Sequence, residues 1–293
     1  MNGNIATVRK WSPVVIIGAP RSGTNMLRDV LTRLPGLETW PCDEINYIWR
    51  HGNKRFPSDE FSTEQSSTPI KQYIRRQFNW VAHNYNAHTV VEKTCANSLR
   101  VEFVDQILPE ARYIFIRRDG LDAVASAMKR WKAELDISYL ASKVRFVPVS
   151  DLPYYAALYL WNRCYRLWSR QGRLAFWGPK LNDMDKLLTI HSIEEVCALQ
   201  WKRCVDAAAK AFSSMPNDRW MEVGYEDFVR DPDKKLHRLV EFLGLKIDDE
   251  LCRKAVKTVT PQSIGKGRSS LGKKNIQRLM PLIKDTMINY GYI

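Results

Sequence analysis

The stretch from Val14 to Asn25 constrains what this chain can fold into more than any other. A short apolar run leads into a turn bounded by Gly18 and Gly23, and apolar residues at helical spacing follow. This order predicts a buried strand, a loop that cradles a phosphate group and the N-terminus of a helix. The two glycines are spaced as in the nucleotide-binding P-loop, but Thr24 stands where that loop has a lysine.

The absence of this lysine narrows the choice of ligand, because the P-loop lysine normally contacts the outer phosphates of a nucleoside triphosphate. Arg21, Ser22, Thr24 and backbone N–H groups suit instead a single 5′-phosphate that carries a further leaving group. An apolar strand followed by Pro-Arg-Ser-Gly-Thr resembles the 5′-phosphosulfate loop of sulfotransferases that use 3′-phosphoadenosine-5′-phosphosulfate (PAPS). This resemblance implies that the following loop residues bind the donor: Pro20, Arg21, Ser22, Gly23, Thr24 and Asn25.

Four short segments predict strands, at residues 14–18, 89–93, 112–117 and 220–225. Helical patterns follow or separate them, which is typical of a mainly parallel sheet with helices on both faces. The predicted class is therefore α/β, and the resemblance implies a P-loop NTPase-like sulfotransferase fold. Each predicted strand ends in or just before a glycine or polar residue, and in such sheets ligands lie beyond the carboxyl ends of the strands.

A chain of 293 residues can form one α/β domain with a sizeable core or two small ones. Because no repeat and no clear linker is visible, we expect a single sulfotransferase domain over residues 1–293. Residues 136–190 are rich in aromatic side chains and predict a variable helical insertion in that domain. The insertion either packs on the core or caps the acceptor. Residues 51–69 are polar and predict a loop.

The sequence lacks a run of eighteen apolar residues, so we expect no transmembrane helix. Its polar N-terminus and the short apolar stretch after it do not have the pattern of a signal peptide. Golgi-resident sulfotransferases carry a membrane anchor. We therefore expect a cytoplasmic enzyme, or one whose anchor has been removed.

The chain is strongly basic, with 45 Lys and Arg against 32 Asp and Glu and a formal charge of +13. Such an excess attracts polyanions. The basic residues are dispersed and no nucleic-acid motif is present, so a doubly phosphorylated cofactor, together with an anionic acceptor, explains the charge at least as well as nucleic acid. The six cysteines show no metal-ligand spacing and predict reduced, buried thiols.

A second motif follows the third predicted strand, where Arg118 is succeeded at helical distance by Ser126. A guanidinium at the strand end and a hydroxyl two turns into the helix could converge on one phosphate. The pair resembles the 3′-phosphate motif of sulfotransferases, in which an Arg-Asp-Gly or similar turn precedes a serine at this spacing. Taken alone, Arg118 could equally be a salt-bridge partner, and Arg117 a bystander.

Two further segments continue the resemblance in the family's order. The Tyr-Glu-Asp turn at Tyr225, followed by an amphipathic helix, implies that this tyrosine lies beside the adenine. The basic, glycine-containing stretch near the C-terminus is similar to a loop that closes over the 3′-phosphate, and Lys266, Gly267 and Arg268 are its candidates. A solvated loop is the alternative interpretation of that stretch.

Sulfuryl transfer needs positioning, charge stabilisation and a base for the acceptor hydroxyl. The resemblance places Lys93 at the leaving oxygen, and Arg21 can supply a second positive contact. Cys95 stands where the cytosolic small-molecule branch has a histidine base, and a neutral thiol is a poor base. Glycan and tyrosylprotein enzymes use a glutamate after the first helix, so we expect Glu44 to be the base, with Asp43 as the fallback. His83 and His88 are weaker alternatives.

These features predict a sulfotransferase that uses PAPS, releases 3′-phosphoadenosine-5′-phosphate (PAP) and requires no metal, because a sulfate ester carries less charge than a phosphate. Its acceptor is a hydroxyl, with a carbohydrate or glycolipid slightly favoured over a tyrosine, a peptide or a small natural product. A P-loop kinase-like phosphotransferase is the runner-up, which Mg²⁺-dependent use of ATP would identify. A nucleotide-binding module without activity is the third possibility.

Overall fold

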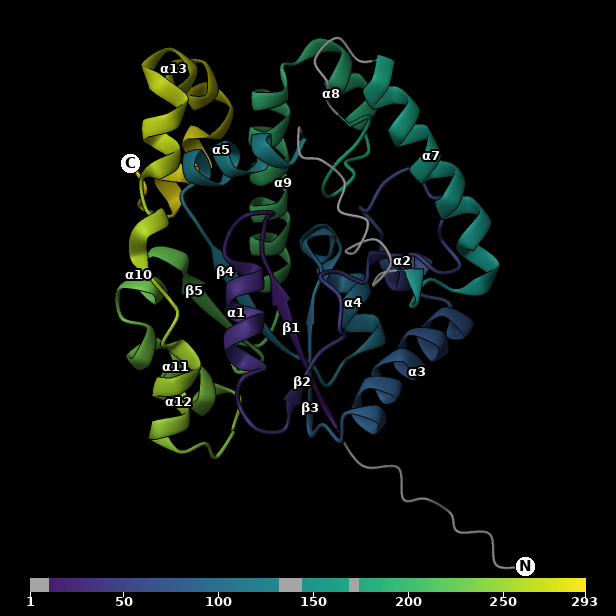
Figure 1. The fold of residues 1–293 in the computed structure, drawn as a ribbon, viewed down its shortest axis with the longest axis vertical. Helices are drawn as coiled ribbons and strands as arrows, with labels where there is room; N and C mark the ends of the chain where they lie inside the picture. The colour runs from purple at the N-terminus through teal and green to yellow at the C-terminus, as the bar shows by residue number, and fades with distance from the viewer. Residues whose placement is uncertain (1–10, 132–143, 169–173) are drawn as a thin grey trace, which may run out of the picture.

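The computed structural model describes residues 11–131, 144–168 and 174–293. A five-stranded parallel sheet runs through its centre in the order β2-β3-β1-β4-β5 (Figure 1). The strands are β1 (Ser12–Ile17), β2 (Leu37–Glu38), β3 (Thr89–Lys93), β4 (Arg112–Arg117) and β5 (Trp220–Gly224). All four predicted strands are present, the predicted fold class is confirmed, and β2 is an addition of two residues at the edge of the sheet.

The central strands β1 and β4 are continuous apolar runs because both faces of the sheet are covered there. Successive side chains of a strand point to opposite faces. In β1, Val15 and Ile17 therefore enter one hydrophobic core, and Val14 and Ile16 enter the other. The central position of β1, between β3 and β4, places the loop after it at the middle of the sheet's carboxyl edge.

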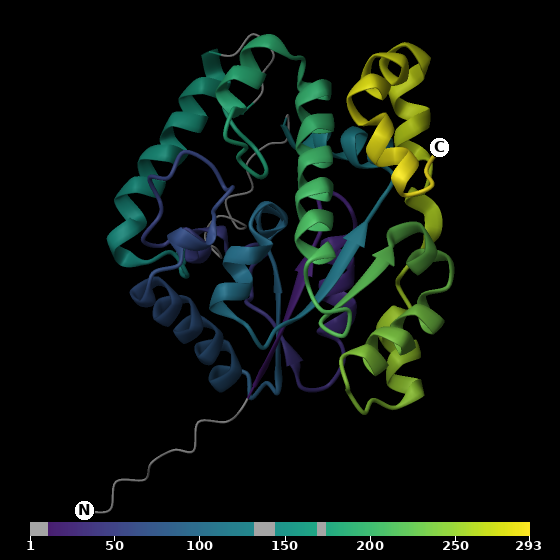
Figure 2. The same ribbon diagram turned by 180° about the vertical axis from the view of Figure 1, so that it is seen from behind.

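Helices cover both faces, as Figures 1 and 2 show from opposite sides. The core built on Val14 and Ile16 contains α1 (Thr24–Leu31), α10 (Tyr225–Arg230), α11 (Pro232–Phe242) and α12 (Asp249–Val256). The other core contains α2 (Asn46–Trp49), α3 (Thr68–Asn84), α4 (Val101–Ile107), α5 (Gly120–Trp131), α8 (Met184–Ile190), α9 (Ile193–Ser213) and α13 (Lys266–Asn289). Short 3₁₀ helices lie at Thr63–Gln65, Cys95–Leu99, Val149–Asp151 and Pro261–Ser263.

The aromatic-rich region that predicts an insertion contains α7 (Leu152–Trp168), which arches along the side of the molecule away from α13 (Figure 1). Its residues 136–143 and 169–173 lie outside the described part of the chain. That this region is an insertion in one domain stays a prediction. Within the described ranges, no helix combines the length and the apolar character needed to cross a membrane.

Candidate active site

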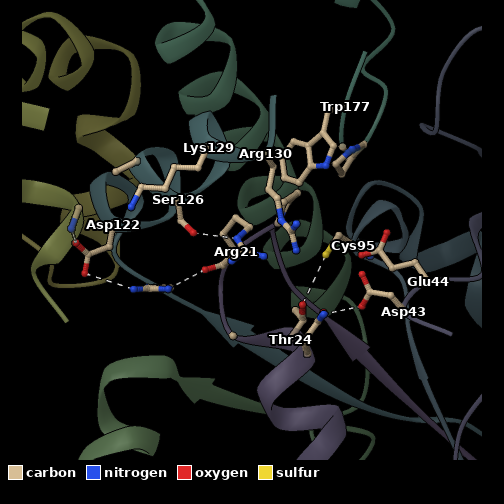
Figure 3. Close-up of a pocket in the computed structure, with 18 of the residues that line it drawn as sticks. Arg21, Thr24, Asp43, Glu44, Cys95, Asp122, Ser126, Lys129, Arg130 and Trp177 are labelled. Carbon is tan, nitrogen blue, oxygen red and sulfur yellow. Dashed lines mark hydrogen bonds and ion pairs between the residues drawn. The ribbon is translucent and has the colours of Figure 1, made fainter. Parts of the chain in front are cut away.

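A cavity of about 840 Å³ opens beyond the carboxyl ends of β1, β3 and β4. Figure 3 shows its walls, which come from the loop after β1, the segment before α2, helix α5 and the loop at residues 174–179. Most of the sequence-predicted site residues line it together: Pro20, Arg21, Gly23, Thr24, Asn25, Glu44, Arg118, Ser126, Tyr225, Lys266 and Gly267. Ser22, Lys93 and Arg268 are not among the lining residues.

The loop after β1 folds tightly because two of its residues have left-handed backbone angles, Arg21 with φ 68° and Gly23 with φ 91°. A Cβ on Gly23 would lie 2.3 Å from a ring carbon of Tyr225, so only glycine fits there. Arg21 adopts a conformation that is uncommon for a residue with a side chain, and such strain is found at functional sites. Arg118 stabilises this backbone conformation by donating from Nη1 to the Arg21 carbonyl oxygen at 3.1 Å. The side chain of Arg21 is held separately, because its Nε donates to Ser126 Oγ at 2.9 Å.

Arg118 itself is fixed between three elements. Its guanidinium lies over the Tyr225 ring, 4.3 Å from the centroid, and Nη2 donates to the Ser263 carbonyl oxygen at 3.0 Å. Among the described residues, its buried Nε has no hydrogen-bond partner, and neither has the buried hydroxyl of Ser22 in the adjacent loop. Buried donors without a partner are costly, and an anion bound in the cavity would offer an acceptor to Arg118, which lines it.

Two carboxylates, Asp43 and Glu44, line the other side of the cavity. Lys93 Nζ, at the end of β3, donates to Asp43 Oδ1 at 2.9 Å and to Glu44 Oε1 at 3.1 Å. Burial acts to lower the pKa of Lys93, but the charges of Glu44 and Asp43 outweigh it and raise that pKa. The resemblance implies that Lys93 contacts the leaving oxygen, which stays a prediction; in the structure its fully buried side chain pairs with both acids.

Three other residues that the sequence analysis named, Arg268, His83 and His88, do not line the cavity. Arg268 pairs through Nε with Asp119 Oδ2 at 2.8 Å, which draws its guanidinium away from the cavity wall. His83 and His88 are exposed near the amino end of β3, on the opposite edge of the sheet from the cavity. Their distance from the cavity makes the two histidines unsuitable as the base. Glu44 and Asp43 remain as the candidate bases.

Cys95 faces the cavity, 3.7 Å from Thr24 Oγ1. Burial, followed by the charge of Glu44, raises the pKa of its thiol well above the ordinary value. The thiol is therefore protonated at neutral pH and cannot accept the acceptor's proton.

We expect Cys95→Ala to keep the midpoints of the pH–rate profile, because a thiol that stays protonated contributes no titration below its raised pKa. Iodoacetamide at pH 7 should leave Cys95 of the wild type unmodified, as mass spectrometry of the Cys95 peptide would show. A profile that loses one limb in the variant would make Cys95 part of the proton transfer.

The lining residues that the sequence analysis did not assign to the site include Asp122, Lys129, Arg130 and Trp177. The first three share one face of α5 with Ser126, a relation that helical spacing from Ser126 could have revealed. Trp177 belongs to the aromatic-rich region of the sequence, for which a cap over the acceptor is one of the two interpretations. Its loop is held from a distance by Gln200 Nε2, which donates to the carbonyl oxygens of Trp177 and Pro179 at 3.0 Å each.

The parallel α/β sheet with a glycine-bounded loop after its central strand defines a P-loop-like protein. The sulfotransferase family matches residues 13–176 and 162–249, so the chain belongs to that family, as its motifs predicted. It is similar to protein-tyrosine sulfotransferase A of Caenorhabditis elegans, with 21% identity over 96% of this chain. The match spans 62% of the length of that relative.

Solved structures show the same fold. The sulfotransferase domain of the Synechococcus PCC 7002 olefin synthase has a TM-score of 0.53 and 17% identity, covering 95% of each chain. Sulfotransferase STF9 from Mycobacterium avium has a TM-score of 0.53 and 13% identity, covering 95% of this chain and 76% of that one.

Proposed function

We propose that this protein transfers the sulfuryl group of PAPS to the hydroxyl of an acceptor, with Glu44 as the base. One observation carries the proposal: a phosphate-type loop with arginines and a carboxylate pair line a single cavity together. The bisphosphate fits the residues present, because Arg118 lines the cavity and its buried Nε has no partner among the described residues. PAPS supplies the sulfuryl group and the phosphate leaving group.

Each side chain has a task that its position supports. Arg118 and Lys266 would hold the 3′-phosphate, with Tyr225 beside the adenine. Arg21 belongs to the phosphate loop and its side chain lines the cavity, where it stabilises negative charge on the group in transfer. Ser126 fixes the Arg21 side chain through its hydrogen bond.

Glu44 removes the proton of the acceptor hydroxyl, and Lys93 holds it in place. The Cys95 backbone N–H also donates to Glu44 Oε1, at 3.4 Å. We assign Lys93 the role of orienting both carboxylates rather than contacting the leaving oxygen. We propose no metal in this reaction, because a sulfate ester carries less negative charge than a phosphate ester and needs less charge neutralisation.

For the acceptor we propose an anionic carbohydrate or the head of an anionic glycolipid. The guanidinium of Arg130 points toward Arg21 below the ring of Trp177 (Figure 3). Burial and the charge of Arg130 together lower the pKa of Arg21, so the two cations stand close enough to repel each other and to attract an additional anion. An indole beside a cation suits a sugar ring that carries an acidic group.

We expect wild-type protein with PAPS to sulfate methyl β-D-glucuronide more efficiently than methyl β-D-glucoside, which differs only in the carboxylate. Arg130→Ala should lower kcat/KM for the glucuronide by about 10- to 100-fold, the value of a hydrogen bond between charged groups, and change the glucoside little. Arg145→Ala, an exposed arginine outside the cavity, is the matched control. Equal losses with both sugars would refute the anionic acceptor, and preference for a phenol or tyrosine peptide would replace the sugar.

A further inference from the structure

Asp122 is a buried carboxylate, 2% exposed, that the proposed chemistry does not use. It accepts hydrogen bonds from three backbone N–H groups at the start of α13: Gly265 to Oδ2 at 2.7 Å, Gly267 to Oδ1 at 2.7 Å and Arg268 to Oδ1 at 3.2 Å. These donors come from a segment far away in the sequence. One side chain of α5 therefore holds the beginning of the C-terminal helix.

The start of α13 depends on this contact for its capping. Gly265 occupies the N-cap position in a left-handed conformation, and no side chain from its own segment caps the helix. The first N–H groups of a helix need acceptors, and the positive end of the helix dipole favours a carboxylate. The start of α13 packs closely against α5, because a Cβ on Gly267 would lie 2.4 Å from the Asp122 Cα.

The same carboxylate also faces Arg118, with Oδ2 at 3.7 Å from Nη2. Asp122 thus touches both elements that frame one end of the cavity, the arginine at the end of β4 and the segment that carries Lys266 (Figure 3). Its charge is balanced by three N–H groups and one guanidinium. Because of that balance, an aspartate can stand beside a site for phosphate without repelling its ligand strongly.

We propose that Asp122 is a positioning residue that sets Arg118 and the Lys266 segment in the geometry that receives the 3′-phosphate. The inference rests on the proposed function, since it assumes a ligand with that phosphate. A site that is ordered in advance loses less entropy on binding. Asp122 therefore gives the protein its preference for a 3′-phosphorylated nucleotide without contacting the nucleotide.

The test compares two ligands that differ only in the 3′-phosphate, PAP and 5′-AMP, by calorimetric titration. Asp122→Ala should weaken PAP at least about tenfold, as expected when charged hydrogen bonds are lost, and change 5′-AMP little. Asp122→Asn keeps an acceptor oxygen, so its PAP affinity should lie between those of the wild type and Asp122→Ala. In both variants, the amides of residues 265–268 should exchange hydrogen faster than in the wild type.

Asp206→Ala is the control, because Asp206 also anchors α13, through Thr286 Oγ1 at 2.8 Å, at a distance from the cavity lining. It should not change the ratio of the PAP and 5′-AMP affinities. If the wild type does not bind PAP, the proposed function fails. If it binds PAP and both Asp122 variants bind PAP equally well, or lose PAP and 5′-AMP to the same extent, the positioning role alone is refuted.

Discussion

Glu44→Gln should lower kcat by about 100- to 10,000-fold, the range that general bases contribute, while PAP affinity stays close to that of the wild type. Glutamine has nearly the same shape as glutamate and still accepts hydrogen bonds from Lys93 and from the Cys95 backbone. It cannot take up the proton of a hydroxyl. The change therefore removes the chemistry of the side chain and little of its packing.

Asp43 provides the matched control, because both carboxylates line the cavity and both accept from Lys93. Asp43 Oδ1 also accepts hydrogen bonds from Asn25 Nδ2 at 2.6 Å and from Arg28 Nη1 at 3.2 Å, both of them residues of α1. This makes it a structural anchor for α1, and Asp43→Asn should cost less activity than Glu44→Gln. Wild-type turnover in Glu44→Gln, with collapse in Asp43→Asn, would move the role of base to Asp43.

Arg118→Ala should weaken PAP by about 1.5–3 kcal/mol, or roughly 10- to 150-fold, which is the value of a hydrogen bond to a charged group. The variant loses a cation at the cavity wall, the unpartnered Nε and the contact with the Tyr225 ring. It also loses the bond that holds the strained Arg21 backbone. Calorimetric titration of PAP into both proteins measures the difference directly.

The neighbouring Arg117 separates a specific effect from a general loss of positive charge. Its Nε donates to Glu222 at 2.6 Å and its guanidinium lies over Tyr290, outside the cavity lining. Arg117→Ala should leave PAP affinity nearly unchanged. Equal affinities in Arg118→Ala and the wild type, or equal losses in the two arginine variants, would contradict the 3′-phosphate assignment.

The central strands β1 and β4 were predictable because they are buried on both faces and therefore appear as continuous apolar runs. β2 could not be found this way, since Leu37–Glu38 is too short to form a pattern. The sequence favours a loop at the start of α13 for a physical reason. Gly267, Gly272 and Pro281 disfavour a helix locally, and Gly272 does interrupt it with φ 72°, yet packing against α5 and α9 holds the segment.

The phosphate loop was predictable for a different reason, because Gly23 has a left-handed φ of 91° and a Cβ on Gly18 would lie 2.6 Å from the Ile116 carbonyl oxygen. The side-chain pairings that depend on tertiary contact could not be predicted from the sequence. The sequence places Lys93 at a strand end but does not say which acids approach it. In the same way, the pairing of Arg268 with Asp119 and the capping of α13 by Asp122 join segments that only the folded chain brings together.

Calorimetric titration of the wild-type protein with PAP, with ATP and Mg²⁺ as the comparison, tests the central claim most directly. We predict that PAP binds without a divalent cation and that Mg²⁺-ATP binds far more weakly, since Thr24 stands in place of the lysine that reaches outer phosphates. No binding of PAP, or a preference for Mg²⁺-ATP, would contradict the sulfotransferase proposal and favour a phosphotransferase.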